Sequence, residues 1–390
     1  MPLPLYLLAA AVFAMGTSEF MLAGLTPDIA AGLGVSTATA GLLTSAFAVG
    51  MVVGAPTTAA LARRWPPRAA LLTFLSVFAG CHVVGALTDD FGILVASRVV
   101  AAVVSAGFLS VALSTVTALV APDRTARALA VLLSGTTLAT IVGVPGGAAL
   151  GSLLDWRATF WSIVILCAFA MIGVAAIDMR RDQEAPRSAG PRLADELRVI
   201  TRPRLVMMML LGVLVNAATF ATFTYLAPVV TDVAGLGDLW VPLALFGFGV
   251  GSFCGVTVAG RLADRRPFEV VALGGPALLV GWIVLAVGGS VPELLLPMTF
   301  VQGTLCFAVG STVIARILAE SHGAPTMGGS YATVALNLGA AVGPAVGGVM
   351  LGTAAGPLGP VWLSAGLVGA ALVVGAVCWT VIRRSCALIR

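Results

Sequence analysis

The chain has 390 residues, of which 59% are hydrophobic and 10% are charged, and its formal net charge is +4. An ordinary soluble domain carries about 25% charged residues, so this composition excludes a water-soluble globule and indicates a membrane protein with many spans. Because lysine is absent and all 21 basic residues are arginines, a phosphate-binding loop of the Gly/Lys type is excluded as well.

The apolar runs predict twelve membrane crossings, since each crossing takes about 20 residues. One long connection, Asp178–Pro203, mixes Arg, Asp, Glu and Pro, as in a solvated linker. We therefore expect an all-α membrane protein with an N-terminal six-helix bundle (1–177), a cytoplasmic linker (178–203) and a C-terminal six-helix bundle with a short tail (204–390). The expected spans are 4–27, 41–61, 69–88, 91–119, 127–152, 158–177, 204–230, 239–260, 268–289, 292–318, 326–352 and 358–381.

The first span contains a lone carboxylate, Glu19, within the apolar run Leu5–Leu25. An acidic residue at the centre of a membrane helix costs roughly 3 kcal/mol on insertion scales, and such residues face a protein interior or a wet cavity. Glu19 is therefore our candidate for proton coupling. The alternative is a structural carboxylate that is hydrogen-bonded to a neighbouring span.

The fourth span contributes a second charge, Arg98. Burial favours a neutral acid, whereas a nearby guanidinium favours the carboxylate. A carboxyl group balanced between these influences could gain and lose a proton during transport, so Arg98 is the second candidate for proton coupling. A structural salt bridge is the alternative for Arg98. His82, in the third span, is interpreted as a packed or interfacial residue because no acid lies at helical spacing within that span.

Two spans at corresponding positions of the halves carry runs of small residues and a proline. Small residues about one turn apart let helix backbones approach closely, and proline bends a helix. Packing alone would explain either run, but the matching positions indicate an internal repeat. The fifth span has Gly143, Pro145, Gly146 and Gly147, and the eleventh has Gly339, Gly343, Pro344 and Gly347.

Nineteen of the arginines lie in alternate connections and the C-terminal tail, and Arg157 is the only arginine in the opposite connections. This asymmetry predicts that both termini and the linker are cytoplasmic. After the eighth span, Gly260 is followed by Asp264 and Arg265. An acid beside basic residues at a helix end could pair across the halves and latch one conformation, with simple cytoplasmic anchoring as the alternative.

These residues resemble the major facilitator superfamily over nearly the whole chain. Gly260, Asp264 and Arg265 look like its gating motif, Arg98 looks like its intramembrane arginine, and the Gly143–Gly147 run resembles the motif associated with drug/proton antiporters. The first copy of the gating motif has Arg63 where Asp is common, so gating is assigned mainly to Asp264 and Arg265. The segments most similar to chloramphenicol-resistance exporters of the twelve-span drug/proton antiporter family are Gly16–Met21, Gly41–Phe47, Gly143–Gly147 and Trp156–Phe160.

The resemblance implies proton-coupled efflux of a small antibiotic, with chloramphenicol as the first choice, from a monomer in the cell membrane. Its partners would be the drug, protons and the lipid bilayer, without nucleic acid, cofactor or metal. Export of arabinose-like sugars or other metabolites stays open, because related exporters share these motifs. The candidate drug contacts are Met15, Phe20, Asn216, Phe220, Tyr225 and Asn337.

Two other classes fit the sequence less well. A membrane-embedded enzyme would need a clustered catalytic set, but the two histidines, His82 and His322, lie in separate halves. A passive channel would not need duplicated Gly/Pro helices or a lone acid that can carry a proton. We therefore expect a transporter that exposes a central cavity alternately to each side of the membrane.

Overall fold

In the computed structural model, the described residues are 3–62, 65–119, 125–175, 198–263, 267–322, 324 and 328–387. Every regular element in these ranges is a helix. The chain divides into two compact units. The first comprises Met1–Gly190 and Gly237–Gly249, and the second comprises Pro191–Leu236 and Val250–Arg390. The division passes through one helix, α12 (Trp240–Ala263).

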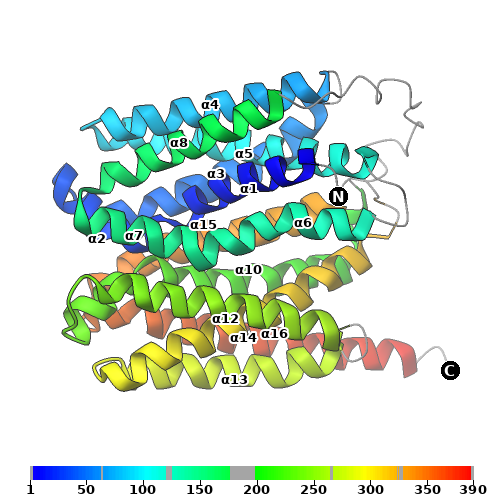
Figure 1. The fold of residues 1–390 in the computed structure, drawn as a ribbon. Coiled ribbons are helices and arrows are strands. Elements are labelled where there is room, and N and C mark those ends of the chain that lie inside the picture. The colour runs from blue at the N-terminus through cyan, green and yellow to red at the C-terminus, as the bar shows by residue number, and fades with distance from the viewer. Residues whose placement is uncertain are drawn as a thin grey trace. The chain divides into compact units, whose positions relative to one another are not determined.

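Before α12, the first unit contains eight α-helices and one short π-helix among the described residues (Figure 1). Its apolar core includes side chains from α1, α3, α4, α5 and α8. The elements are α1 (Leu3–Phe20), α2 (Leu22–Leu33), α3 (Thr37–Ala62), α4 (Pro67–Leu87), α5 (Phe91–Leu119), α6 (Thr125–Leu138), π-helix η2 (Ala139–Gly143), α7 (Val144–Leu153) and α8 (Trp156–Ala175).

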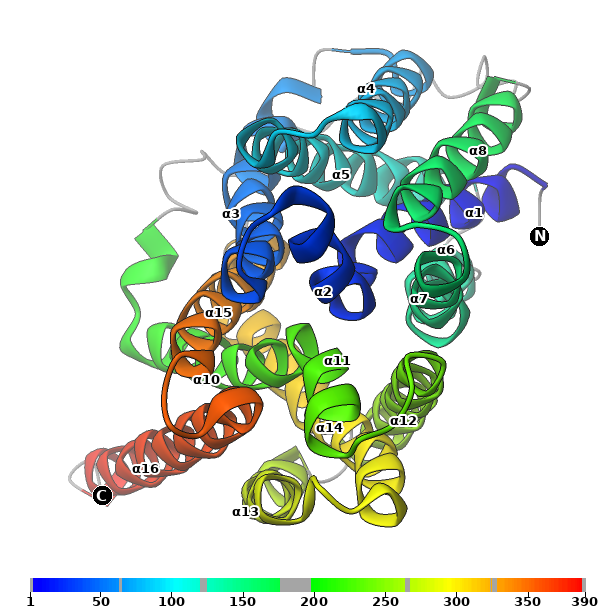
Figure 2. The ribbon, with the colours of Figure 1, turned by 90° about the vertical axis from the view of Figure 1, so that its left-hand side faces the viewer.

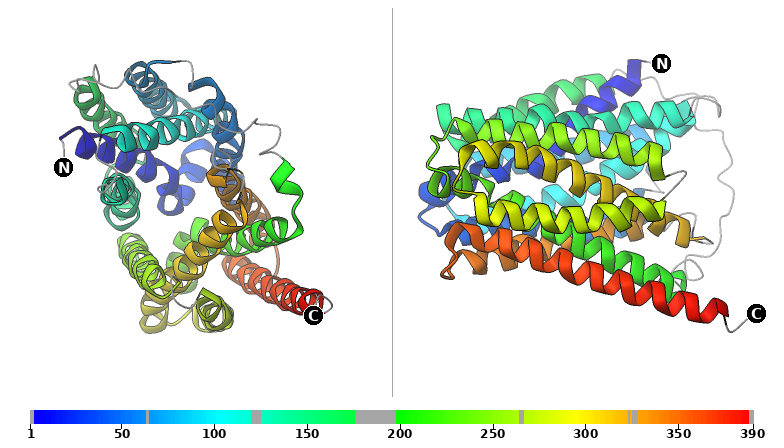
Figure 3. Two further views of the ribbon diagram at one scale, coloured as in Figure 1. Left: turned by 90° about the vertical axis from the view of Figure 1, so that its right-hand side faces the viewer. Right: turned by 90° about the horizontal axis from the view of Figure 1, so that it is seen from below.

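In the second unit, α10 contacts both α15 and α16, and α13 runs beside α16 (Figure 3). The elements that follow α8 in the chain are η4 (Val199–Thr201), α10 (Pro203–Thr224), α11 (Leu226–Pro228), π-helix η5 (Val229–Val233), α12 (Trp240–Ala263), α13 (Pro267–Gly288), α14 (Pro292–Glu320), α15 (Gly328–Leu351), η6 (Gly356–Leu358) and α16 (Gly359–Ala387).

Eleven segments of the described chain are long and apolar enough to cross a membrane, and there are twelve if the bent pair α1 and α2 is one span. This agreement in length and composition confirms the predicted all-α membrane fold. The first span differs from the expected helix 4–27, because it bends by 53° at Met21 and continues to Leu33. Figure 2 shows α2 turning away from the line of α1.

A proline removes one backbone hydrogen bond from α2, shortly after this bend. Pro27 lies inside α2 and has no N–H for the carbonyl of Ala23, so one backbone bond of the helix is missing. In the same turn, the hydroxyl of Thr26 donates to the carbonyl of Leu22 at 2.6 Å. Glu19 lies in the last turn of α1, immediately before the bend.

Matched close contacts in the two units support the internal repeat, although they pair Gly339 with Gly135, which lies before the predicted fifth-span run. On α6, a Cβ atom at Gly135 would collide with the carbonyl oxygen of Ala9 on α1. On α15, a Cβ atom at Gly339 would lie 2.5 Å from the carbonyl oxygen of Val213 on α10. The same sequence spacing separates Gly135 from Gly339 and Ala9 from Val213. Each unit therefore packs its first span against its fifth by the same glycine contact.

Candidate functional site

Arg98 lies at the centre of a buried polar cluster in the first unit. Its side chain extends from α5 to α1, where Nη1 donates to the hydroxyl of Ser18 and Nη2 donates to the carbonyl of Ser18, both at 2.7 Å. The ring of Phe47 on α3 covers the guanidinium, with 4.5 Å between Cζ and the ring centroid. Arg98 is only 1% exposed, so its charge is held in the protein interior by Ser18 and an aromatic face.

His82 extends this cluster to α4. Its Nε2 atom lies 2.6 Å from the Ser18 hydroxyl, and its Nδ1 atom lies 2.7 Å from the carbonyl of Phe78. The imidazole also packs against the rings of Phe78 and Phe160. The prediction that His82 is a packed residue is thus confirmed, but its hydrogen bond to Ser18 was missed.

Glu19 follows Ser18 in the same turn of α1 and is half-buried. Within the described part of the chain, its carboxyl group makes no hydrogen bond or ion pair, although it is close enough to interact electrostatically with Arg98. Arg98 likewise has no hydrogen-bond partner at Nε among these residues. The structure therefore brings the two candidate charges into one neighbourhood without joining them directly.

The fifth-span motif lies against the part of α1 that carries this cluster. Gly143 ends the π-helix η2, and a Cβ atom there would collide with the side chain of Thr17. One turn later, the carbonyl of Gly147 accepts a 2.8 Å hydrogen bond from Thr159 on α8. Gly146 differs, because a Cβ atom there would meet nothing within 4 Å. Gly143 thus allows close packing against α1 and Gly147 against α8, whereas Gly146 makes no such contact.

The eleventh-span motif makes the matching contact in the second unit. A Cβ atom at Gly343 would collide with the carbonyl of Ala217 on α10, and one at Gly347 would lie 3.1 Å from the Tyr225 ring. The Tyr225 hydroxyl donates to the carbonyl of Pro344 at 2.9 Å. These contacts join α10 and α15 along the small-residue face that the sequence predicted.

The candidate drug contacts differ in how much of each side chain is accessible. Met15 is buried in the core of the first unit, whereas Phe20 is half-buried beside Glu19. In the second unit, Phe220 packs edge-to-face on Phe223, and Tyr225 is fully buried.

The two candidate asparagines both use their amide nitrogens within the second unit. Asn216 Nδ2 donates to the carbonyl of Leu336 at 2.6 Å, joining α10 to α15. Asn337 Nδ2 donates within α15, to the carbonyl of Thr333 at 3.0 Å. Among the described residues, the amide oxygen of Asn337 accepts no hydrogen bond, so this residue keeps a polar group available.

The gating candidates can be placed only in part. Gly260 lies in the last turn of α12, while Asp264 and Arg265 lie outside the described residues.

A metal centre finds no support in the described ranges, where no three His, Cys, Asp or Glu side chains form a group that could hold an ion.

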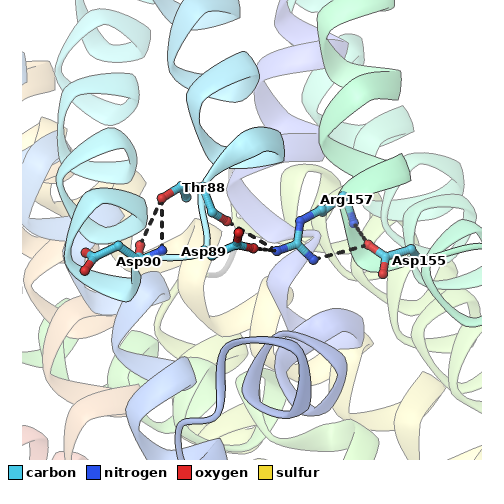
Figure 4. A network of polar contacts seen from close by, with 5 residues as sticks. All are labelled: Thr88, Asp89, Asp90, Asp155 and Arg157. Atoms are coloured by element: carbon cyan, nitrogen blue, oxygen red, sulfur yellow. Dashed lines mark hydrogen bonds and ion pairs between the residues drawn. The ribbon is translucent and has the colours of Figure 1, made fainter.

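Arg157 organises a second polar network, at the end of the first unit where α4 meets α5 and α7 meets α8 (Figure 4). Its Nη2 atom lies 2.6 Å from the Asp89 carboxylate and 3.3 Å from the carbonyl of Thr88. Its backbone N–H donates to Asp155 at 2.7 Å, and its guanidinium lies over the ring of Trp156. The network joins the connection between α4 and α5 to the connection between α7 and α8.

Trp156 should matter more to folding than the charge of Arg157. Trp156 is 2% exposed and packs edge-to-face on Phe160, so Trp156→Ala should cost about 3–5 kcal/mol. Arg157→Met should cost about 1 kcal/mol or less, because the Asp89 carboxylate is mostly exposed and its ion pair is screened. Size-exclusion chromatography of detergent-solubilised protein after heating would measure both losses. Equal losses would contradict this ranking.

Known proteins provide an independent comparison. Residues 8–290 match the family described as the Major Facilitator Superfamily. The chain is 62% identical over 374 residues to the chloramphenicol resistance protein of Streptomyces lividans, covering 96% of this chain and 95% of that protein. It is 32% identical over 361 residues to the inner membrane transport protein YdhP of Escherichia coli (strain K12), covering 90% of each.

A solved structure of the nucleoside transporter NupG matches with a TM-score of 0.78, covering 96% of this chain and 99% of that one. Because the two sequences are only 14% identical, this likeness concerns the fold alone. The described helices therefore follow a fold similar to that of the solved structure.

Proposed function

The chain belongs to the major facilitator superfamily, and we propose that it is a multi-pass transporter that exports chloramphenicol across the cell membrane in exchange for protons. The assignment of chloramphenicol as the substrate rests on the high identity, over nearly the full length, to a protein named for chloramphenicol resistance. The relatives and the fold are those of transporters, so the chain is not an enzyme. The arginine distribution supports cytoplasmic termini.

Proton coupling is assigned to Glu19 with Arg98. A carboxyl group that is half-buried, near a fixed cation and without a hydrogen-bond partner in the described chain can exchange a proton without first breaking a local bond. Protonation from outside would accompany drug release, and proton loss to the cytoplasm would follow when the cavity faces inward. Alternating access would come from the two six-helix bundles joined by the linker, with Asp264 and Arg265 as the gate and a monomer as the working unit.

Drug contacts are assigned first to Phe20 and Asn337. Chloramphenicol has an aromatic ring and hydroxyl groups, so it suits an apolar surface with a few polar groups. Phe20 adjoins Glu19, and Asn337 has an amide oxygen available. Asn216 and Tyr225 already use polar atoms to join α10 to α15, so we assign them a supporting role. Met15 and Phe220 would shape the apolar wall.

Uptake into inverted membrane vesicles tests this proposal. Vesicles containing the protein should accumulate labelled chloramphenicol when a proton gradient is imposed, and a protonophore should abolish that accumulation. Labelled arabinose should not accumulate, which addresses the alternative of sugar export. Vesicles from cells lacking the protein are the control. Accumulation of arabinose without chloramphenicol would reject the proposed substrate, and accumulation that survives the protonophore would reject proton coupling.

A further inference from the structure

The buried cluster of the first unit has only one consistent arrangement of protons. Arg98 can only donate, so the Ser18 oxygen accepts the 2.7 Å bond from Nη1. The carbonyl of Phe78 can only accept, so Nδ1 of His82 donates to it. The single hydroxyl proton of Ser18 must then go to Nε2 of His82, at 2.6 Å. His82 is therefore a neutral imidazole that carries its proton on Nδ1.

A protonated His82 does not fit these bonds. An imidazolium would donate from both nitrogens, so Ser18 would receive two donors and its own proton would lose its acceptor. A second cation would also lie beside Arg98 in a low-dielectric interior. The other titratable groups of the cluster, Glu19 on α1 and Cys81 on α4, interact electrostatically with Arg98. From α8, the aromatic ring of Phe160 faces the imidazole.

We propose that His82 is a positioning residue for the proton-coupling site, an inference that rests on the proposed function. By accepting the Ser18 proton, His82 turns the free lone pairs of the hydroxyl oxygen toward Arg98. Ser18 then holds both terminal nitrogens of the guanidinium, through its hydroxyl and its carbonyl. Because Ser18 directly precedes Glu19, this arrangement fixes a positive charge near the carboxyl group without pairing the two.

The expected consequence of losing His82 follows from this geometry. Without its acceptor, the Ser18 hydroxyl can rotate and direct its proton toward Arg98, which weakens the bond to Nη1. A released guanidinium can pair directly with Glu19, and an ion pair favours the carboxylate over the neutral acid. Protonation would then require a more acidic solution, so the pH dependence of efflux should move toward lower pH.

The pH profile of chloramphenicol uptake in proteoliposomes tests this consequence. In His82→Phe, which keeps a ring but removes the acceptor, the pH of half-maximal uptake should fall by about 1 unit. In His82→Gln, whose side-chain oxygen can accept the Ser18 proton, it should stay at the wild-type value. Ser364→Ala, which removes a buried hydroxyl bonded to Ala218 in the second unit, is the control and should leave the midpoint unchanged.

A His82→Phe protein that transports with the wild-type midpoint would overturn the positioning role while leaving the proposed function intact. Absence of proton-driven uptake by the wild-type protein would instead reject the proposed function. The two failures are therefore distinguishable in the same assay.

A spectroscopic test does not depend on how well a variant at position 82 folds. The chain has two histidines, so nitrogen-15 histidine labelling of a His322→Gln protein reports His82 alone. Nuclear magnetic resonance should show a neutral imidazole protonated on Nδ1, unchanged between about pH 5 and pH 8, the range in which an ordinary histidine titrates. An imidazolium, or a proton on Nε2, would overturn the proposal.

Discussion

Glu19→Gln is expected to abolish proton-driven efflux while leaving the fold intact. Glutamine has nearly the same shape as glutamic acid but cannot release or bind a proton near neutral pH. Each pH unit across the membrane corresponds to about 1.4 kcal/mol, or roughly tenfold in drug accumulation. Without a group that couples to this gradient, the drug ratio across the vesicle membrane should fall to about 1 at any imposed pH difference. Labelled-drug uptake at several gradients measures that ratio.

Glu293→Gln is a matched control because Glu293 is an exposed acid in the first turn of α14. It should keep wild-type accumulation. Glu19→Asp retains the acid but shortens the side chain by one methylene, so it should keep coupling at a reduced rate. Cells that express Glu19→Gln and remain as drug-resistant as the wild type would remove Glu19 from the mechanism without affecting the fold.

The spans could be predicted from the sequence because lipid imposes a strong length and composition rule on each helix. The bend at Met21 could not. Met21 is neither Gly nor Pro, and Pro27, which removes a backbone bond, lies further along the chain. Packing of α2 against α7 also helps to set the bend, as Gly24 meets Ala148 so closely that no Cβ atom fits. Contacts of this kind involve residues distant in sequence.

The polar cluster was only half-predicted for a similar reason. Glu19 and Arg98 stand out as charges in apolar spans, whereas helical spacing within the third span indicates no partner for His82. Its partner, Ser18, belongs to a different helix. Buried polar groups need hydrogen-bond partners, so the polar residues of the first, third and fourth spans are candidates to pair with one another. The sequence pattern still could not choose which pairs meet.

The glycine motifs show a further limit of sequence patterns. Gly146 and Gly343 belong to matching runs, yet their surroundings differ. Gly146 faces open space, whereas Gly343 lies against the backbone of Ala217. Periodicity identifies the small-residue face of a helix, but only the packed structure shows which glycine allows the close approach.

Gly343→Ala should therefore destabilise the second unit by about 1–3 kcal/mol through overpacking. The added methyl group would meet a backbone carbonyl, which cannot rotate away as a side chain can, so α15 must move away from α10. That movement would also strain the bonds from Asn216 to Leu336 and from Tyr225 to Pro344, each worth about 1 kcal/mol. Thermal unfolding of the purified protein in detergent measures the loss.

Gly329→Ala is the matched control, because it lies on the same helix and its added methyl group would meet nothing within 4 Å. It should be neutral or slightly stabilising, since alanine is the better helix former by up to about 1 kcal/mol. Gly146→Ala should behave in the same way within the first unit. Equal thermal stability of Gly343→Ala and Gly329→Ala would mean that α10 and α15 do not touch backbone to backbone. The small residues of the eleventh span would then need another explanation, such as the movement of α15 during transport.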